Sequence, residues 1–198
     1  MKKIFPSFIL LLCAFYFYSC TCRTCGAEEI KLPATVKVSA DEFIISYTGK
    51  NFFDSYIKFD PIRSQSLGNE FLLVYEFKMK EKSFVDELIT FSIDSTGNII
   101  STKDIVGIPS VLENPNSVNF EIDEAAAREI AKENKLEPGI KEWKVGFMWN
   151  AKWQRYVWHI LNTLSEGEGS HGYRGSGKEM IIAPSNGEVL EYNEWNVF

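Results

Sequence analysis

The glycine-rich segment 167–179 holds the residues whose spacing comes nearest to known chemistry. Its first glycines have the G-x-G-x-x-G spacing of a dinucleotide-binding loop, and its last residues fit most of a phosphate-binding loop. Glu179, however, stands where Ser or Thr should hold magnesium, and residues 180–184 predict a strand ended by proline. Both motifs need a helix directly after the glycines, because its N-terminus receives the phosphate. We therefore expect no nucleotide, and interpret the segment as a long hairpin connection.

The two histidines, His159 and His171, are the next candidates for chemistry. Neither lies in a His-Glu-x-x-His motif or in another spacing typical of metal ligands. Ser170 is not in a nucleophile elbow either, since Glu168 stands where that motif needs its first glycine. We predict a protein that is not an enzyme and holds no metal or cofactor. His159 is then a hydrogen-bonded strand residue, and His171 a loop residue.

Aromatic side chains are better candidates, and for binding instead of catalysis. Trp and Tyr join a large apolar surface to a polar atom, so exposed copies are typical of protein contact sites and of surfaces that stack on sugars. Most of the aromatic residues must form the core of a sheet. The residues that we expect to contact a partner are Trp153, His171, Tyr173, Arg174 and Trp195.

Cys20 is the residue whose surroundings indicate covalent modification. A short basic start is followed by the apolar stretch 4–17, which is shorter than the roughly 20 residues of a membrane-spanning helix. A small serine precedes Cys20, as signal peptidases require. The segment resembles a lipoprotein signal, with Phe17 in place of the usual Leu. This resemblance implies a signal peptide at 1–19, lipid on Cys20, and a place in a bacterial cell envelope, with the membrane and its face left open.

Residues 20–34 show no apolar periodicity and are interpreted as a tether. The tether contains a second candidate for lipid attachment, Cys22, which also forms a Cys-x-x-Cys pair with Cys25. No strand precedes this pair and no second pair completes a zinc site. We expect these two thiols to be free or joined in a small disulfide.

The composition argues against nucleic acid as a partner. The formal charge is −6, and the N-terminal lysines belong to the export signal. Proteins that bind phosphate backbones use clustered Lys and Arg, and the rest of this chain has no such cluster. With 45% hydrophobic and 14% aromatic residues, the chain can form a core without disulfides.

Alternating apolar residues predict strands in the first half, 35–117, which we expect to be a β-rich unit. Residues 70–80 and 85–93 have the period of two of half-buried strands. A turn at 94–98 follows, because Gly97 can adopt positive φ, and Ile99 then begins a returning strand. The best helical candidate in this half is only the short stretch 51–59.

The second half, 118–198, predicts an α+β unit. A helix extends over 123–136, capped by Asp123 and stopped before Pro138. Gly187 aligns with Gly97 of the first half, which suggests a duplication. Strands are predicted over 142–149, 153–164, 178–183 and 188–195.

The second half also resembles PepSY domains. That family combines a helix of the pattern Ile-x-x-x-x-Ala with a Trp-bearing strand and a Gly turn. The resemblance implies an antiparallel sheet packed against a helix, two tandem units if the halves are duplicated, a role in binding or restraining partners, and no catalytic residues. The matching residues are Ile122, Ala126, Ala127, Ile130, Ala131, Trp158 and the run Asn186-Gly187-Glu188-Val189-Leu190, with Pro184 in place of the usual Asp.

The sequence thus predicts a non-catalytic, lipid-anchored envelope protein that binds a protein or peptide partner. One such partner is a peptidase, whose activity the protein would modulate. The alternative is a glycan-binding lipoprotein. Three or more aromatic residues in a solvent groove would favour the glycan. A flat apolar patch or a bare sheet edge would favour the protein partner.

Overall fold

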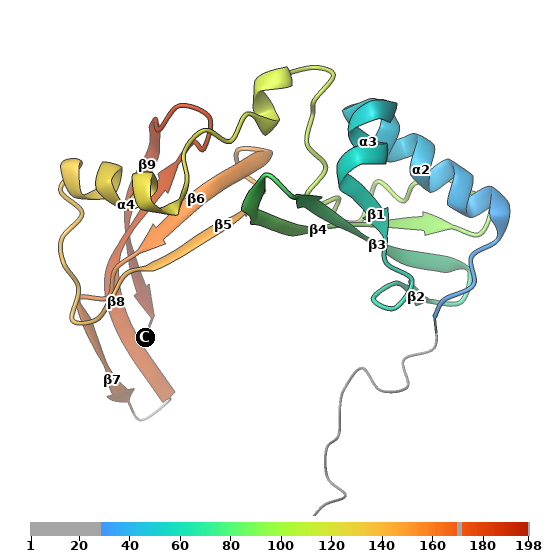
Figure 1. Ribbon diagram of the computed structural model, residues 1–198. Coiled ribbons are helices and arrows are strands. Elements are labelled where there is room, and N and C mark those ends of the chain that lie inside the picture. The colour runs from blue at the N-terminus through green and yellow to red at the C-terminus, as the bar shows by residue number, and fades with distance from the viewer. Residues whose placement is uncertain (1–28, 170–171, 198) are drawn as a thin grey trace, which may run out of the picture.

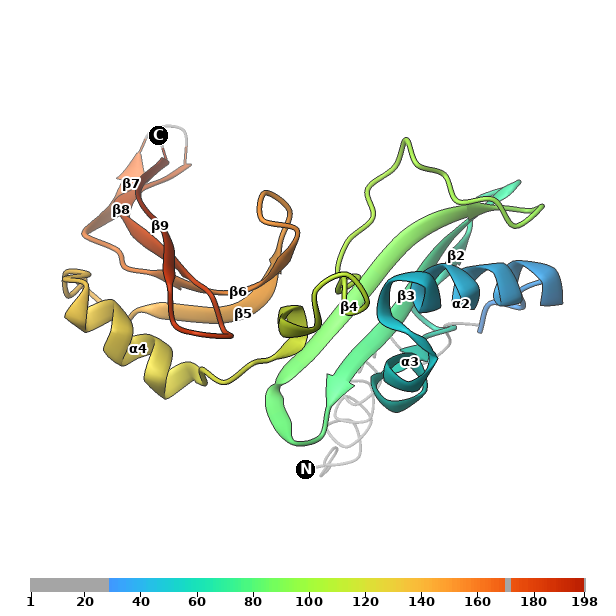
Figure 2. The ribbon, with the colours of Figure 1, turned by 90° about the horizontal axis from the view of Figure 1, so that it is seen from above.

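The computed structural model describes residues 29–169 and 172–197, which form an α+β protein with two antiparallel sheets (Figure 1). The helices α2 and α3 cover one face of the first sheet, and α4 lies against the second (Figure 2). The predicted class, an antiparallel sheet packed against a helix, is confirmed. The signal peptide, the cysteines and His171 lie outside the described residues.

The first sheet is built around β3, which pairs with β4 on one side and with β1 and β2 on the other. Alternate side chains of β3 face the helices, and Leu73, Tyr75 and Phe77 are fully buried there. The elements of this half are α2 (Ala34–Thr48), α3 (Lys50–Tyr56), β1 (Ile57–Phe59), β2 (Gln65–Ser66), β3 (Glu70–Met79) and β4 (Lys82–Asp94).

Helix α2 corrects the expectation that the first half contains no helix comparable to that of the second. Its buried residues Val36, Ala40 and Ile44 recur every four positions, as one helical face requires. Apolar residues also point outward, since Val38 and Tyr47 are exposed, and they obscure the amphipathic pattern. The first half is therefore a mixed helix and sheet unit.

The turn after β4 forms as predicted. Gly97 has a φ of 95°, and the carboxylate of Asp94 accepts hydrogen bonds from the backbone N–H groups of Thr96 and Asn98, both at 2.9 Å. The returning strand does not form. Ile99 and Val106 instead make isolated bridges to Ile93 and Thr90 of β4, without a continuous strand between them.

The helix of the second half, α4, extends over Glu124–Glu133 and begins as predicted. The side chain of Asp123 accepts a hydrogen bond of 2.8 Å from the backbone N–H of Ala126, which is an N-cap. Ala127 and Ala131, one helical turn apart, are completely buried against the sheet. A short 3₁₀ helix, η2 (Pro115–Val118), precedes α4.

The second sheet corrects the interpretation of the glycine-rich segment. Residues 167–169 and 172–179 form strands instead of a loose connection, and β8 pairs with β6, β7 and β9 in turn. The strand predicted to begin at Trp153 begins at Arg155, because Trp153 lies in a turn. The strands are β5 (Lys144–Asn150), β6 (Arg155–Leu161), β7 (Ser165–Gly169), β8 (Gly172–Ile182) and β9 (Val189–Val197).

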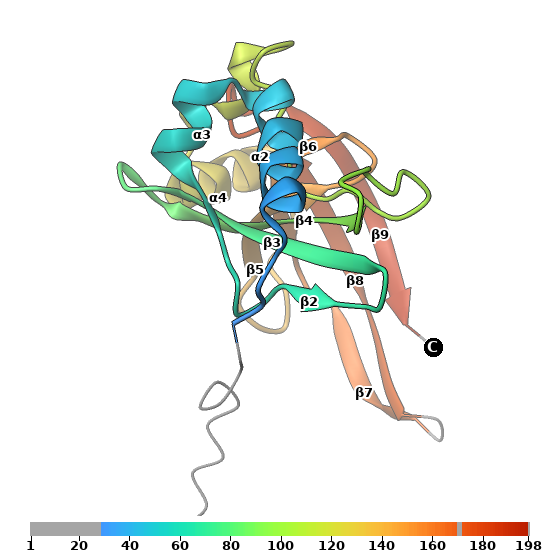
Figure 3. The same cartoon turned by 90° about the vertical axis from the view of Figure 1, so that its right-hand side faces the viewer.

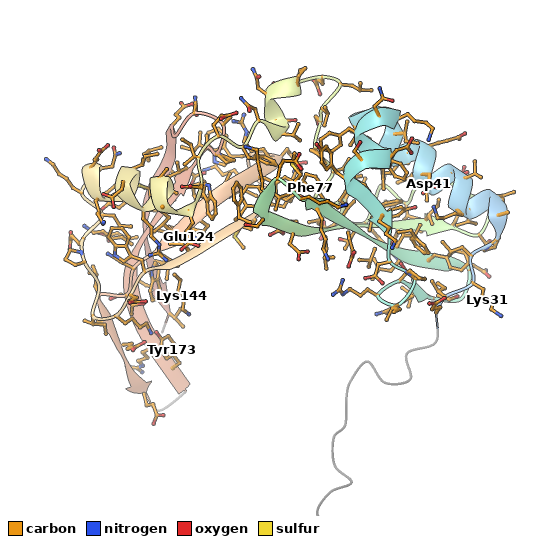
Figure 4. The ribbon with its side chains drawn as sticks, in the orientation of Figure 1. Lys31, Asp41, Phe77, Glu124, Lys144 and Tyr173 are labelled. Atoms are coloured by element: carbon orange, nitrogen blue, oxygen red, sulfur yellow. The ribbon has the colours of Figure 1, made fainter. Side chains whose placement is uncertain are left out.

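Aromatic side chains join the two halves into one core. Phe77 and Phe84, near the tip of the β3–β4 hairpin, pack against the second half. The ring centroid of Phe77 lies 5.4 Å from that of Tyr156, and the centroid of Phe84 lies 5.1 Å from that of Trp158. The hydroxyl of Tyr156 donates a 2.8 Å hydrogen bond to the carbonyl of Gly107. Phe77 is labelled between the two sheets in Figure 4.

No helix within the described ranges is long and apolar enough to cross a membrane.

Candidate binding face

One face of the second sheet is covered by α4, whereas no helix of the described residues lies on the opposite face (Figure 3). Side chains alternate along strands, so the residues between the core positions of β6, β8 and β9 point to this opposite face. We call it the open face. Its aromatic and hydrogen-bonding residues include Trp153, His159, Tyr173, Glu179, Glu191, Asn193 and Trp195.

Three of the predicted contact residues, Trp153, Tyr173 and Trp195, come together on the open face. They belong to three separate chain segments, and the β8–β9 pairing brings them to one surface. Figure 4 labels Tyr173 near the free end of the β7–β8 hairpin. The neighbouring Arg174 is exposed, but strand alternation places it on the other side of β8. His171 and Cys20, which were also predicted, lie outside the described residues.

The turn between β5 and β6 positions Trp153. The side-chain oxygen of Asn150 accepts hydrogen bonds from the backbone N–H groups of Lys152 at 3.0 Å and Trp153 at 3.1 Å. Gln154 completes the turn with a φ of 47°, in the left-handed region. The indole N–H of Trp153 then donates to Glu191, 2.5 Å away on β9. A local turn therefore fixes the indole across the sheet.

Glu191 is held by three donors. The Nζ atom of Lys152 lies 2.8 Å from its carboxylate, and the side-chain amide of Asn193 donates to it at 3.0 Å. Lys152, Asn193 and Trp153, in that order of effect, lower the pKa of Glu191 to about 2. The carboxylate is therefore ionised at neutral pH and acts only as an acceptor.

His159 and Glu179 form a second polar pair on this face. The Nε2 atom of His159 lies 2.9 Å from a carboxylate oxygen of Glu179, and the amide of Asn193 donates to the other oxygen at 3.5 Å. Both side chains are 27% exposed. The prediction that His159 is a hydrogen-bonded strand residue is confirmed. Asn193 touches both carboxylates and so links the two pairs into one network.

Glycines make room for the rings of Trp195 and Tyr173. A Cβ atom at Gly177 would lie 2.7 Å from the indole nitrogen of Trp195, and one at Gly175 would lie 2.7 Å from the hydroxyl of Tyr173. Both rings therefore lie over bare backbone. The indole N–H of Trp195 donates to the carbonyl of Asn162 at 2.9 Å, which fixes the ring there.

Glu166 fixes the Tyr173 side chain near the free end of the β7–β8 hairpin. Its carboxylate accepts a 3.0 Å hydrogen bond from the Tyr173 hydroxyl and pairs with the ammonium group of Lys141. Lys141 first, and Tyr173 second, hold the pKa of Glu166 below its usual value. The Tyr173 ring is thus anchored through its polar atom.

Two surface hollows lie away from the open face. One of about 680 Å³ follows α4 and is lined by Arg128, Lys132 and Trp143, and another of about 610 Å³ lies beside β1. The cations of the first hollow, Arg128, Lys132 and Lys141, are paired with Glu124, Glu129 and Glu166. Within the residues that the structure describes, no group of three or more His, Cys, Asp or Glu residues could hold a metal ion. The open face combines three aromatic side chains with a hydrogen-bonded polar network, which makes it the candidate site.

Sequence reasoning missed Glu179, Glu191 and Asn193. The signal was present, because Glu191, Asn193 and Trp195 alternate along a predicted strand and must share a face. Strand glutamates, however, are ordinarily solvated, and only the cross-strand register brings Glu179 opposite Asn193. The pairing of strands, which the sequence does not reveal, assembles the network.

No known family model matches the chain, and no curated protein is similar to it. The resemblance to PepSY domains therefore stays a prediction, and function is argued from the geometry.

Proposed function

We propose that the chain is a non-catalytic binding protein, anchored by lipid on Cys20 in a bacterial envelope, that holds a protein or peptide partner. A peptidase is one such partner, because the PepSY resemblance implies restraint of peptidases. The leader that precedes Cys20 supports the anchor. Two or more acyl chains on one protein hold it stably on a membrane, whereas a single chain does so only marginally.

The observation that supports a protein partner most is the bare edge of β9. Within the described residues β9 pairs with β8 alone, so one side of Val189–Val197 presents backbone N–H and C=O groups to solvent. An extended peptide segment can add to such an edge as a further strand. The strand has no Lys or Arg, and its exposed Glu194 favours a peptide with basic side chains.

The anchor is tested by the mass of the mature N-terminal peptide from native membranes. We expect a diacylglycerol and an acyl group on Cys20 in the natural chain, and neither in Cys20→Ser. A natural chain that retains Met1 and has no acyl mass would contradict the anchor.

The partner is tested by a photo-crosslinking residue at position 194, an exposed site on β9. We expect one adduct of defined mass in native envelopes, formed with a protein. Position 38 on α2 is the matched control, since Val38 is 55% exposed but lies far from β9 in the fold. The proposal fails if position 194 gives no adduct, or gives the same adducts as position 38.

A further inference from the structure

We propose that the open face binds an uncharged polysaccharide chain, which lies along β8 across the rings of Tyr173, Trp195 and Trp153. This ligand goes beyond the protein partner proposed for the edge of β9, because the peptide pairs with backbone groups of β9 whereas the sugar chain contacts side chains of the adjoining open face. The proposal rests on the ring geometry, the mixed polar groups between the rings, and the charge balance of the face.

The three rings are placed as stacking surfaces. Tyr173 and Trp195 lie over Gly175 and Gly177, so backbone supports one side of each ring. Their polar atoms are engaged by Glu166 and Asn162, which holds the rings in place without a ligand. Lys152 and Arg155 lie over the third ring, that of Trp153, at 5.8 and 6.0 Å from its centroid. An apolar ring face with a fixed orientation suits the C–H face of a sugar.

The spacing of the rings suits a chain and not a single sugar. Gly175 and Gly177 are two residues apart on β8, so the rings above them are about 7 Å apart at roughly 3.3 Å per residue. Trp153 reaches Glu191, which lies opposite Ile181, about 13 Å further along at the same rise. The row thus extends over about 20 Å, which is long enough for several sugar units.

The gap between Trp195 and Trp153 is filled with hydrogen-bonding groups. Glu179 and Glu191 are acceptors, Asn193 is a donor and an acceptor, and His159 presents a ring nitrogen. A sugar hydroxyl both donates and accepts, so it is matched by such a mixture. Opposite His159, Gly146 leaves open space where a side chain would stand, which gives a ligand access to the polar groups.

The charges on the face favour an uncharged chain. Each carboxylate has its own partner: Lys152 for Glu191, Lys141 for Glu166, and His159 for Glu179. Arg155 is a further cation beside this network, with its guanidinium 6.0 Å from the centroid of the Trp153 ring. An uncharged chain is therefore favoured by the pairing of the carboxylates and not by an absence of cations.

The same face is poorly suited to an apolar protein contact. Its central aliphatic residues are covered, since Val157 is 0% and Ile181 only 4% exposed. Its exposed aliphatic side chains, Met148 at 43% and Val197 at 46%, belong to β5 and β9, which are separated by β6 and β8. A protein hot spot would instead need a contiguous apolar patch.

The test uses the full-length protein in detergent on an array of uncharged and anionic polysaccharides, followed by calorimetry with a hexasaccharide of the chain that binds. We expect binding to at least one uncharged chain and to no anionic chain. Trp195→Ala and Trp153→Ala should each weaken it about tenfold or more. Tyr192→Ala is the matched control, because Tyr192 is exposed on the same strand but points to the α4 side. Melting temperatures confirm that each variant is folded.

Three results would overturn the inference. The first is no binding to any uncharged polysaccharide by the folded natural chain. The second is equal loss of affinity in Tyr192→Ala and Trp195→Ala. The third is that no sugar binds and that Trp195→Ala and Trp153→Ala each abolish the crosslinked adduct at position 194. The open face would then be part of the protein interface. Failure of the proposed protein partner alone, with no adduct at position 194, leaves sugar binding unaffected.

Discussion

At the scale of single residues, Glu87 is an acidic side chain on the inward face of β4, in alternation with Val85 and Ile89. It lies opposite Phe77 in the register, near the core that joins the two halves. Burial, and to a lesser degree the neighbouring Asp86, raises the pKa of Glu87 to about 7. The folded protein therefore keeps this carboxyl protonated at a pH where the unfolded chain has lost the proton.

This difference predicts a pH dependence of stability. Because the folded state binds the extra proton, the free energy of unfolding falls as pH rises from about 4.5 to about 7. Glu87→Gln removes the titration. The melting temperature of this variant should therefore equal that of the natural chain at pH 4.5 and exceed it at pH 8. Calorimetry at both pH values measures this. An equal difference at both pH values would show that Glu87 does not titrate in this range.

Single residues were also where prediction from sequence went furthest. Trp153, Tyr173 and Trp195 were named from residue type, and the β8–β9 pairing and the turn that holds Trp153 place them on one face. Their contact with a partner stays a prediction. Glu179 and Glu191 could not be named, since their roles come from partners that are distant in sequence: His159 for Glu179, and Trp153 for Glu191.

At the scale of elements, the close approach of Trp195 to β8 predicts the effect of two glycine substitutions. In Gly177→Ala the new Cβ would lie 2.1 Å from the carbonyl oxygen of Asn162, so the strand or the indole must shift. We expect a loss of about 1–3 kcal/mol in the free energy of unfolding, as for other overpacked sites. Gly146→Ala is the control, with no atom within 4 Å of the new Cβ.

Urea unfolding compares the two variants, and near-ultraviolet circular dichroism follows the indole of Trp195. Equal stability of Gly177→Ala and Gly146→Ala would mean that Trp195 does not lie over β8 as described.

The elements also show where local patterns mislead. Helix α4 was predicted because Asp123 and Pro138 mark its ends, and the structure confirms its start. Helix α2 was missed because apolar residues surround it on several sides. The glycine-rich segment was taken for a loop, since glycine weakens strands in general. Here the glycines give space to rings from other positions, and the pairing with β7 and β9 holds the strand.

At the scale of the whole molecule, the shared aromatic core predicts cooperative unfolding. Phe84 packs on Phe147 and Trp158, with ring centroids 5.3 and 5.1 Å away, so neither half completes its core alone. All the tryptophans lie between 143 and 195, in the second half, whereas far-ultraviolet circular dichroism reports both halves. The urea transitions seen by indole fluorescence and by circular dichroism should therefore coincide.

Phe147→Ala should lower the midpoints of both transitions together, by about 3–5 kcal/mol in the free energy of unfolding, as for other buried phenylalanines. Separate midpoints, or a loss confined to the fluorescence signal, would show two independent units. The sequence could not settle this point, because its prediction of a unit over 35–117 and another over 118–198 depended on local patterns and not on the contacts between them.

The central claim is that this protein binds its partners through the second sheet. Hydrogen–deuterium exchange tests it most directly, by comparing the protein in native envelopes with the purified protein in detergent. The account predicts slower exchange in the envelope for Gly172–Ile182 and Val189–Val197, and unchanged exchange for Ala34–Thr48. Protection of α2 with β8 and β9 unchanged, or no difference at all, would contradict it.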